Sequence, residues 1–286
     1  MEQISTLSMV LEPPPSFGAT VSKVNSLGPY LQGALLERAD SEFVGILHRL
    51  PFNPYSQCCT LDGEGRVVWR ISALTQEVAD ELIDPVLDMG RVELRAVGAT
   101  FDVAERSLET VDLKTLLDSI YEEGPSRVRL QFLTPAAFKS QGSYVFMPSV
   151  RLIFQNLLMH YSQVYEGSKE IDFDTVDYIV QNVRITPYNL QSRYYAHAAA
   201  QDKKIPAFVG SLTLSIGGPA SMAGLVRMLL RFGEFAGVGI KTSMGMGGFA
   251  CYPIQPRARG AHEASEAREA HEAREAHETD GGEMAR

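Results

Sequence analysis

Residues 219–254 read PASMAGLVRMLLRFGEFAGVGIKTSMGMGGFACYPI, and this stretch decides the fold prediction. Apolar residues at helical spacing predict a helix over 219–235, and a strand is predicted over 248–254. Between them lies a glycine-rich loop, residues 237–248. A dinucleotide-binding loop follows a strand and opens a helix, which is the reverse order, and no Gly-Lys-Ser/Thr of a Walker A loop occurs. The loop is therefore not predicted to bind a dinucleotide or a nucleoside triphosphate.

The glycine-rich loop has a composition suited to RNA phosphates. Glycine allows positive φ and a close approach of the backbone to a ligand. Backbone N–H groups of such a loop can point at phosphates, and lysine, threonine and serine side chains add further donors. A tight packing turn fits the same composition. The candidate phosphate contacts are Gly237, Gly239, Lys241, Thr242, Ser243, Gly245 and Gly247.

Upstream of this stretch, the second half of the chain contains further strands and a helix. Strands are predicted over 127–134, 178–187 and 207–216, and a helix over 148–162 with Pro148 in its first turn. Together with the helix and strand that flank the loop, the order is β-α-β-β-α-β. This is the order of a ferredoxin-like domain.

The first half of the chain repeats that order. We therefore expect an α+β fold with tandem ferredoxin-like (RRM-like) domains, a C-terminal glycine-rich loop and a low-complexity tail. Strands are predicted over 3–12, 56–61, 66–73 and 91–106, helices over 28–40 and 75–89, and a helical turn from Asp40 and Ser41.

Three regions of unlike charge follow from a division near Gly124. Residues 1–124 carry a net charge of -11, residues 125–257 carry +6, and the tail, residues 258–286, carries -4, within a total of -9. The total argues against a polyanion-binding protein. The expected C-terminal domain, residues 125–257, is the region suited to a phosphate backbone, although a chance scatter of solvated charges would look the same.

The tail repeats the triplet Glu-Ala-X from Glu263 to Glu278. These residues favour helix, but a three-residue period builds no apolar stripe, so we expect an appendage that is dispensable for chemistry. The three cysteines lack the paired spacing of a zinc site, which favours a reducing compartment. With no signal peptide and no apolar run of about 20 residues, the expected location is the cytoplasm.

Four stretches carry a resemblance to a known family. The helix, glycine-rich loop and strand of 219–254 are similar to the signature of the repeat-associated RNA-binding superfamily of CRISPR systems. LHRLPFNPYS (47–56), LTPAAFK (133–139) and FVGSL (208–212) resemble, more narrowly, the family of CRISPR repeat endoribonucleases. The resemblance covers residues 1–256. It implies tandem ferredoxin-like domains, no metal or other cofactor, and cleavage of precursor RNA in its repeats that leaves a 2′,3′-cyclic phosphate and a 5′-hydroxyl.

Attack by an internal 2′-hydroxyl needs a base, an acid and donors for the phosphate charge. His48 is the candidate for a proton-transfer role, because imidazole titrates near neutrality. Tyr30 would orient the 2′-hydroxyl, as a tyrosine does in some members of the family. Those members also carry a lysine shortly after the histidine, which is absent here, so Arg49 and Lys241 are the candidates for that positive charge. The structural alternatives are a helix-end histidine bonded to backbone and a core tyrosine.

Aromatic and basic residues alternate before the last predicted strand pair, as in surfaces that stack bases and hold phosphates. A solvated loop is the alternative. His197 lies in the same stretch, whereas His160 ends an apolar helix and is expected to be structural. The residues of the expected RNA groove are Arg184, Arg193, Tyr194, Lys203 and Lys204.

Three functions remain open from the sequence. The first is a metal-independent endoribonuclease acting on single-stranded or hairpin CRISPR repeat RNA. The second is a non-catalytic guide-RNA-binding subunit of an effector complex, which would share the fold but not the chemistry of His48. The third is a ferredoxin-like small-molecule-binding or scaffold protein, which the overall acidity favours. Candidate partners besides RNA are other effector-complex subunits and a second copy of the chain, with no membrane involved.

Overall fold

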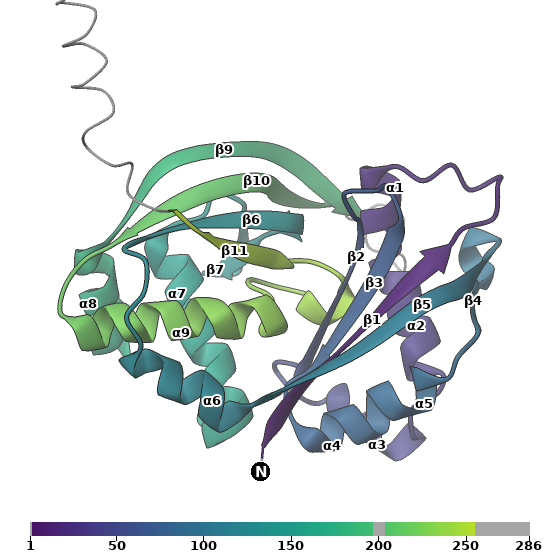
Figure 1. The fold of residues 1–286 in the computed structure, drawn as a ribbon, viewed down its shortest axis with the longest axis horizontal. Helices are drawn as coiled ribbons and strands as arrows, with labels where there is room; N and C mark the ends of the chain where they lie inside the picture. Colours follow the sequence, from purple (N-terminus) through teal and green to yellow (C-terminus); the bar gives the residue numbers. More distant parts are fainter. Residues whose placement is uncertain (1, 197–203, 255–286) are drawn as a thin grey trace, which may run out of the picture. The chain divides into compact units, whose positions relative to one another are not determined.

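Two antiparallel sheets organise the chain in the computed structural model, which describes residues 2–196 and 204–254 (Figure 1). The strands of the first sheet are β1 (Gln3–Glu12), β2 (Tyr55–Leu61), β3 (Val67–Ala73), β4 (Arg91–Leu94) and β5 (Ala99–Asp112). They lie in the order β2-β3-β1-β5-β4. Successive side chains of a strand point to opposite faces of the sheet, and one face packs on helices. Alternate residues such as Leu7 and Met9 therefore enter the first core.

The helices of the first half cover one face of this sheet. They are α1 (Val21–Asn25), α2 (Gly28–Leu36), α3 (Ser41–Leu47), α4 (Gln76–Val78), the π-helical turn Ala79–Ile83 and α5 (Asp84–Leu87). The side chain of Asp40 accepts hydrogen bonds from the N–H groups of Glu42 and Phe43, which is the expected N-cap of α3. Leu31 of α2 and Trp69 of β3 are fully buried in the same core.

The second sheet has four strands and an accessory hairpin. Its strands are β6 (Arg127–Ala136), β9 (Val183–Ala196), β10 (Lys204–Ile216) and β11 (Phe249–Pro253), in the order β11-β6-β10-β9; the hairpin is β7 (Phe138–Ser140) and β8 (Ser143–Val145). If β4 is set aside, both sheets place the first strand between the third and the last, with the second strand beyond the third. The predicted tandem ferredoxin-like fold is therefore confirmed.

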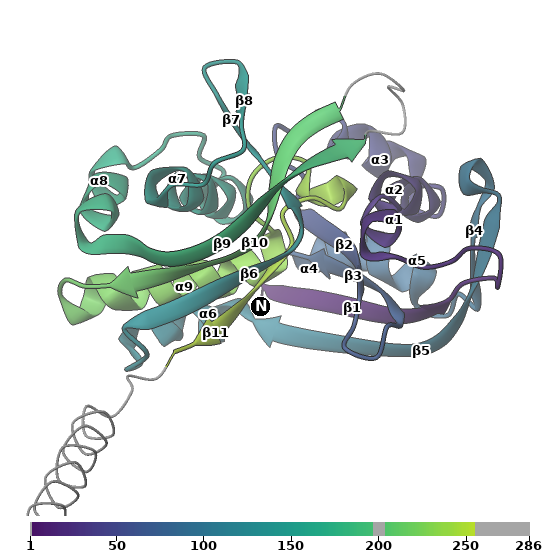
Figure 2. The ribbon, with the colours of Figure 1, turned by 90° about the horizontal axis from the view of Figure 1, so that it is seen from above.

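Helices of the second half pack on one face of this sheet (Figures 1 and 2). They are α7 (Val150–Tyr161) with the π-helical turn Ser162–Glu166, α8 (Phe173–Asn182) and α9 (Ala220–Ala236); α6 (Leu113–Asp118) and the 3₁₀ turn Ser119–Tyr121 precede the second sheet in the chain and pack against α9. Phe132, Phe154 and Phe208 are buried in the core between the sheet and these helices. Among the described residues, no helix has the length and apolar character needed to cross a membrane.

Two expected strands are wrong in part. The strand predicted over 91–106 is a hairpin, because Gly98 adopts φ 65° and reverses the chain after the 3₁₀ turn Arg95–Val97. The strand predicted over 178–187 begins only after α8, which Asp172 caps by accepting a hydrogen bond from the N–H of Thr175. An amphipathic helix with a strong N-cap therefore replaces the first part of the expected strand.

The start of α7 also differs from the expectation. Pro148 lies before the helix, and Ser149 is its N-cap, with the hydroxyl accepting from the N–H of Leu152 at 3.2 Å. A serine side chain thus takes the capping position, and the proline only fixes the entering backbone.

Candidate active site

Three segments that are distant in sequence meet around the glycine-rich loop: the start of α2, the turn after α3, and the loop itself. A Cβ atom at Gly28 would collide with the carbonyl oxygen of Met244, so only glycine lets α2 begin this close to the loop. Asn53, in the turn that follows His48, donates from Nδ2 to Ser243 Oγ at 3.1 Å. The structure therefore brings together the segments that carry Tyr30, His48 and Lys241.

Gln57 of β2 joins two of these segments and was missed from the sequence. Its Nε2 donates to the carbonyl oxygens of Gly28, at 3.0 Å, and Ser243, at 2.9 Å. Its Oε1 accepts from Trp69 Nε1 at 2.7 Å, and the residue is buried. The only sequence signal is a glutamine within a strand that is otherwise core-forming, in a chain with one tryptophan. Such a fully bonded buried amide fixes its partners in place.

The glycines of the loop act as scaffold, which corrects the expectation that their N–H groups face phosphates. The N–H groups of the four candidate glycines already donate within the protein, and these four glycines are buried. The hydroxyl of Ser243 is also buried and accepts from Asn53, and Thr242 is buried as well. The acceptors are Gly233 O for Gly237, Asn156 Oδ1 for Gly239, Thr242 O for Gly245 and Pro135 O for Gly247.

Lys241 is the loop residue that keeps a charged group near the surface. It is half-buried, and burial lowers the pKa of its ammonium group. Its φ of 57° is left-handed, which costs a residue with a Cβ about 1 kcal/mol. Nζ lies 3.6 Å from the sulfur of Met244. A strained, partly desolvated lysine is a common feature of functional sites.

His48 caps the C-terminal end of α3 and has an exposed side chain. Its backbone N–H donates to Val44 O at 3.1 Å, but its ring has no hydrogen-bond partner in the described part of the chain. The alternative of a helix-end ring bonded to backbone is therefore not the arrangement seen. The neighbouring Arg49 is also exposed, and its guanidinium reaches back toward Gly45.

Tyr30 is half-buried at the start of α2 and packs against the first core. It also lines a hollow of about 250 Å³ together with Glu93 and Arg95. Tyr30 therefore both packs against the core and borders open space, which combines the two interpretations of the sequence.

A groove of about 700 Å³ lies between α1 and the second sheet. Lys23 of α1 and Arg193 and Tyr194 of β9 line it, and among the described residues no aspartate or glutamate does. Tyr194 is 72% exposed, as a base-stacking residue would be. The neighbouring Tyr195 also lines the groove and donates its hydroxyl to the carbonyl oxygen of Met244. The groove thus leads to the glycine-rich loop.

The other expected groove residues lie elsewhere. Arg184 donates to the carbonyl oxygens of Val180, at 3.1 Å, and Val183, so it caps the end of α8. Lys204 is exposed at the start of β10 but does not line the groove. Lys203 and His197 lie outside the described residues.

The face of the second sheet opposite α7, α8 and α9 carries two arginines that were missed from the sequence. Arg127 pairs with Ser215, and Arg129 pairs with Thr213 and Tyr252, so their side chains lie on the same face as the groove residue Arg193. The guanidinium of Arg129 lies 5.3 Å from the ring centroid of Tyr252. We call Arg127, Arg129 and Arg193 the open-face arginines. The sequence RVR at 127–129, within a predicted strand, could have predicted two arginines on one face of the sheet.

Comparison with solved structures places this fold among tandem ferredoxin-like proteins of one kind. A Cas6 product complex matches with a TM-score of 0.68 and 21% identity, over 87% of this chain and 99% of that one. Cas6 from Thermus thermophilus matches with a TM-score of 0.58 and 20% identity, over 88% and 98%. At these identities the matches show the fold.

Comparison of sequences identifies the family, whereas the structural matches show only the fold. Residues 130–249 match the family model described as CRISPR-associated endoribonuclease Cas6. A protein of that name from Mycobacterium tuberculosis (strain ATCC 25618 / H37Rv) is 37% identical over 90% of this chain and 81% of its own length. Another, from Streptococcus thermophilus, is 38% identical over 76% and 87%. The chain belongs to the Cas6 family of CRISPR-associated endoribonucleases, which confirms the resemblance seen in the sequence.

Proposed function

We propose that this chain cleaves CRISPR precursor RNA within its repeats, without a metal ion, and so releases guide RNAs. The observation that carries the proposal is the convergence of the α2 start, the His48 turn and the glycine-rich loop, tied by Gln57 and Asn53. These hydrogen bonds join the segments that carry the exposed imidazole of His48, Tyr30 and Lys241.

The RNA path in this proposal runs along the groove and the face of the second sheet opposite α7, α8 and α9. The groove lining has no carboxylate, and the open-face arginines have no carboxylate within 4.0 Å in the described part of the chain. Backbone phosphates would contact these arginines, and bases would stack on Tyr194 and Tyr252. Tyr195 connects this path to the loop, and hence to the cleavage site.

The chemistry follows from the groups at the convergence. The 2′-hydroxyl loses its proton, and its oxygen attacks the adjacent phosphorus to form a 2′,3′-cyclic phosphate. The bond from phosphorus to the 5′-oxygen breaks, and that oxygen takes up a proton. His48 serves one of these proton transfers, Tyr30 orients the 2′-hydroxyl, and Lys241 or Arg49 stabilises the charge on the phosphate.

We also propose the wider setting of the reaction. The substrate is a repeat in single-stranded or hairpin form, and the product passes to other subunits of an effector complex. The enzyme acts in the cytoplasm, where the precursor is transcribed, and a second copy of the chain is a candidate partner. Lys203, Lys204 and Arg184 remain candidate contacts to RNA beyond the groove.

The test is cleavage of the repeat RNA from the host's own CRISPR array in EDTA. We expect the native chain to cut at one site, a substrate with a 2′-deoxy group at that site to survive, and His48→Ala to cut at least about 100-fold more slowly. Glu42→Ala, an exposed change on the same helix, is the control and should cut at the native rate.

The other outcomes separate the alternatives. Unchanged cutting by His48→Ala would keep the activity and move the chemistry away from His48. Tight binding without cutting would favour a non-catalytic RNA-binding subunit. Cutting of the 2′-deoxy substrate would rule out attack by the internal hydroxyl.

A further inference from the structure

His160, in the second half of the chain, contacts the turn that follows His48. Its ring stacks on Phe52, with centroids 3.7 Å apart and an angle of 17° between the planes. Phe52 lies four residues after His48, and it packs against the second core rather than the first. The turn that carries His48 is therefore held by a side chain from α7.

The same histidine connects to the glycine-rich loop through Asn156, one helical turn earlier in α7. Asn156 Oδ1 accepts from the N–H of Gly239 at 2.6 Å, so its Nδ2 must face His160 Nε2, 3.1 Å away. Nε2 therefore accepts, and the ring proton resides on Nδ1. One imidazole thus contacts the His48 turn with its face and orients the loop with its edge.

The environment keeps this imidazole neutral. His160 is 2% exposed, and burial lowers its pKa to about 3. Nδ1 is also buried and has no hydrogen-bond partner in the described residues. A buried donor of this kind costs free energy, and an apolar residue would fill the same space without that cost. The accepting role of Nε2 is what an apolar residue cannot supply.

We propose that His160 is a positioning residue for the cleavage reaction, which sets the His48 turn through Phe52 and the glycine-rich loop through Asn156. This inference rests on the proposed function, since it concerns the placement of His48 and Lys241. His160 itself takes no part in proton transfer. A displacement of about 1 Å at a reacting group can slow a reaction by about 100-fold, so a residue outside the chemistry can control the rate.

Three variants separate the two contacts. Phe52→Ala removes the stack and leaves the Asn156 bond, His160→Phe keeps a stacking ring and removes the acceptor, and His160→Ala removes both. Hydrogen exchange should then rise in residues 48–55 for Phe52→Ala and His160→Ala only. It should rise in residues 237–248 for the two His160 variants only. Ile153→Ala, another buried change in α7, is the control for lost core packing and should raise neither segment selectively.

Cleavage provides the second readout. We expect single-turnover cutting of the repeat RNA to slow by about 10- to 100-fold in His160→Ala. The RNA dissociation constant should stay within about 2-fold. The pH profile of the rate should keep its shape, because His160 does not titrate in the working range.

The outcomes distinguish this inference from the proposed function. Segment-selective exchange with unchanged cutting, in a chain where His48→Ala also cuts normally, would overturn the proposed site and, with it, the positioning role. Slowed cutting without selective exchange would overturn the positioning role alone. A changed pH profile in His160→Phe would also overturn it, by showing that the imidazole exchanges protons during the reaction.

Discussion

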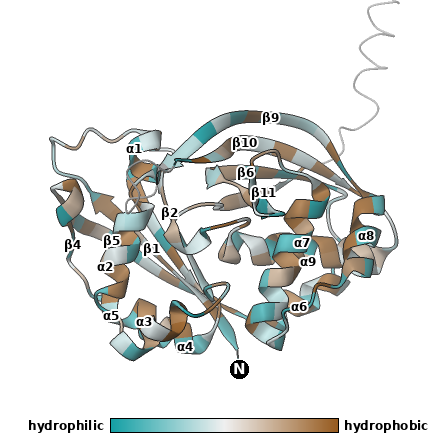
Figure 3. Cartoon of the chain, turned by 180° about the vertical axis from the view of Figure 1, so that it is seen from behind, coloured by the Kyte–Doolittle hydropathy of each residue, from teal (hydrophilic) through white to brown (hydrophobic). Residues whose placement is uncertain are grey.

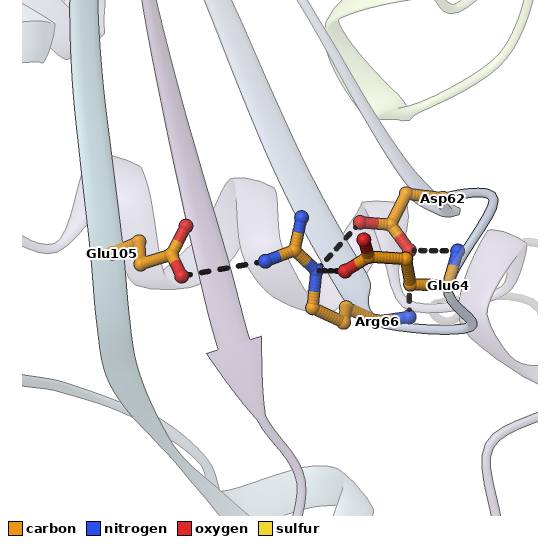
Figure 4. A network of polar contacts seen from close by, with 4 residues as sticks. All are labelled: Asp62, Glu64, Arg66 and Glu105. Atoms are coloured by element: carbon orange, nitrogen blue, oxygen red, sulfur yellow. Dashed lines mark hydrogen bonds and ion pairs between the residues drawn. The ribbon is translucent and has the colours of Figure 1, made fainter.

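Arg66, in the first sheet's β2–β3 turn, and Arg129, in the second sheet, have opposite kinds of neighbour. In the turn between β2 and β3, Arg66 is surrounded by carboxylates: Nε lies 2.8 Å from Asp62 and 3.2 Å from Glu64, and Nη1 lies 3.3 Å from Glu105 (Figure 4). Hydrogen bonds from the backbone and side chain of Arg66 lower the pKa of Asp62. On the second sheet, Arg129 has a tyrosine as its neighbour and no carboxylate within 4.0 Å among the described residues.

This difference indicates where a polyanion can bind on an acidic chain. The net charge of -9 predicts repulsion of RNA, but interactions between exposed charges are screened beyond about 8 Å at physiological salt. The local arrangement therefore decides. Arginines already paired with carboxylates offer little to a phosphate, whereas no carboxylate of the described residues lies within 4.0 Å of the open-face arginines. Figure 3 shows hydrophilic stretches along β9, which carries one of them.

The largest expected effect on RNA affinity comes from removing the charges of the open-face arginines on the second sheet. We expect the triple variant Arg127→Gln, Arg129→Gln, Arg193→Gln to weaken repeat-RNA binding by about 100-fold and to lower the salt dependence of binding. Each substitution removes one contact to a phosphate, and binding then releases fewer counterions from the RNA. Titration of labelled RNA at several salt concentrations measures both quantities.

The matched control removes three arginines from the strands and turns of the first sheet: Arg66, Arg91 and Arg95, each of which has a carboxylate within 4.0 Å. Replacing these with glutamine should leave the affinity within about 2-fold. Equal weakening by the two triple variants would show that total charge, and not pairing, governs binding.

The sequence predicted most elements because their signals are local. Asp40 begins α3, and the helix and strand around the glycine-rich loop appear as α9 and β11. The failures had a shared cause, since a turn or a cap overrode the strand signal at Gly98 and at Asp172. A glycine or an aspartate alone does not predict a turn or a helix start, because both residues are also common in loops.

The candidate site was only partly predictable, since its organisation depends on contacts between distant residues. His48 and Tyr30 could be named from local pattern and resemblance. Gln57 could not, because its three partners come from three separate segments. The glycines of the loop were read as ligand contacts, yet their N–H groups are used inside the protein, and only a tertiary structure reveals that use.

The two halves of the chain also differ in their buried groups, because the second core contains the neutral imidazole of His160. Unfolding returns His160 from a pKa of about 3 to about 6.5, so the unfolded chain binds more protons between these values. Stability should therefore fall as the pH drops below about 6.5. Between pH 7.5 and pH 5 the loss is about 2 kcal/mol, or about 30-fold in the unfolding equilibrium.

Urea unfolding of the native chain and His160→Phe at both pH values isolates this contribution. The variant should lose less stability on acidification by that amount, because all other titrating groups are shared. Parallel pH dependence in the two proteins would show that His160 is not buried as a neutral ring.

The sharpest test copies the pattern of the first sheet onto the second. Ser215 of β10 lies between Arg184 and Arg127 in the strand register. A carboxylate at this position would pair with an arginine and repel phosphates, so Ser215→Glu should weaken RNA binding by about 10-fold. Ser215→Gln has the same size without the charge and should stay within about 2-fold of the native affinity.

The two variants together decide between charge and shape. A loss that is larger in Ser215→Glu and diminishes at high salt follows from pairing, because screening weakens both the new ion pair and the repulsion of phosphate. Equal losses in the two variants would mean that the side chain blocks the surface by its size. In that case the open-face arginines would mark where RNA lies, but their freedom from carboxylates would not explain why it binds there.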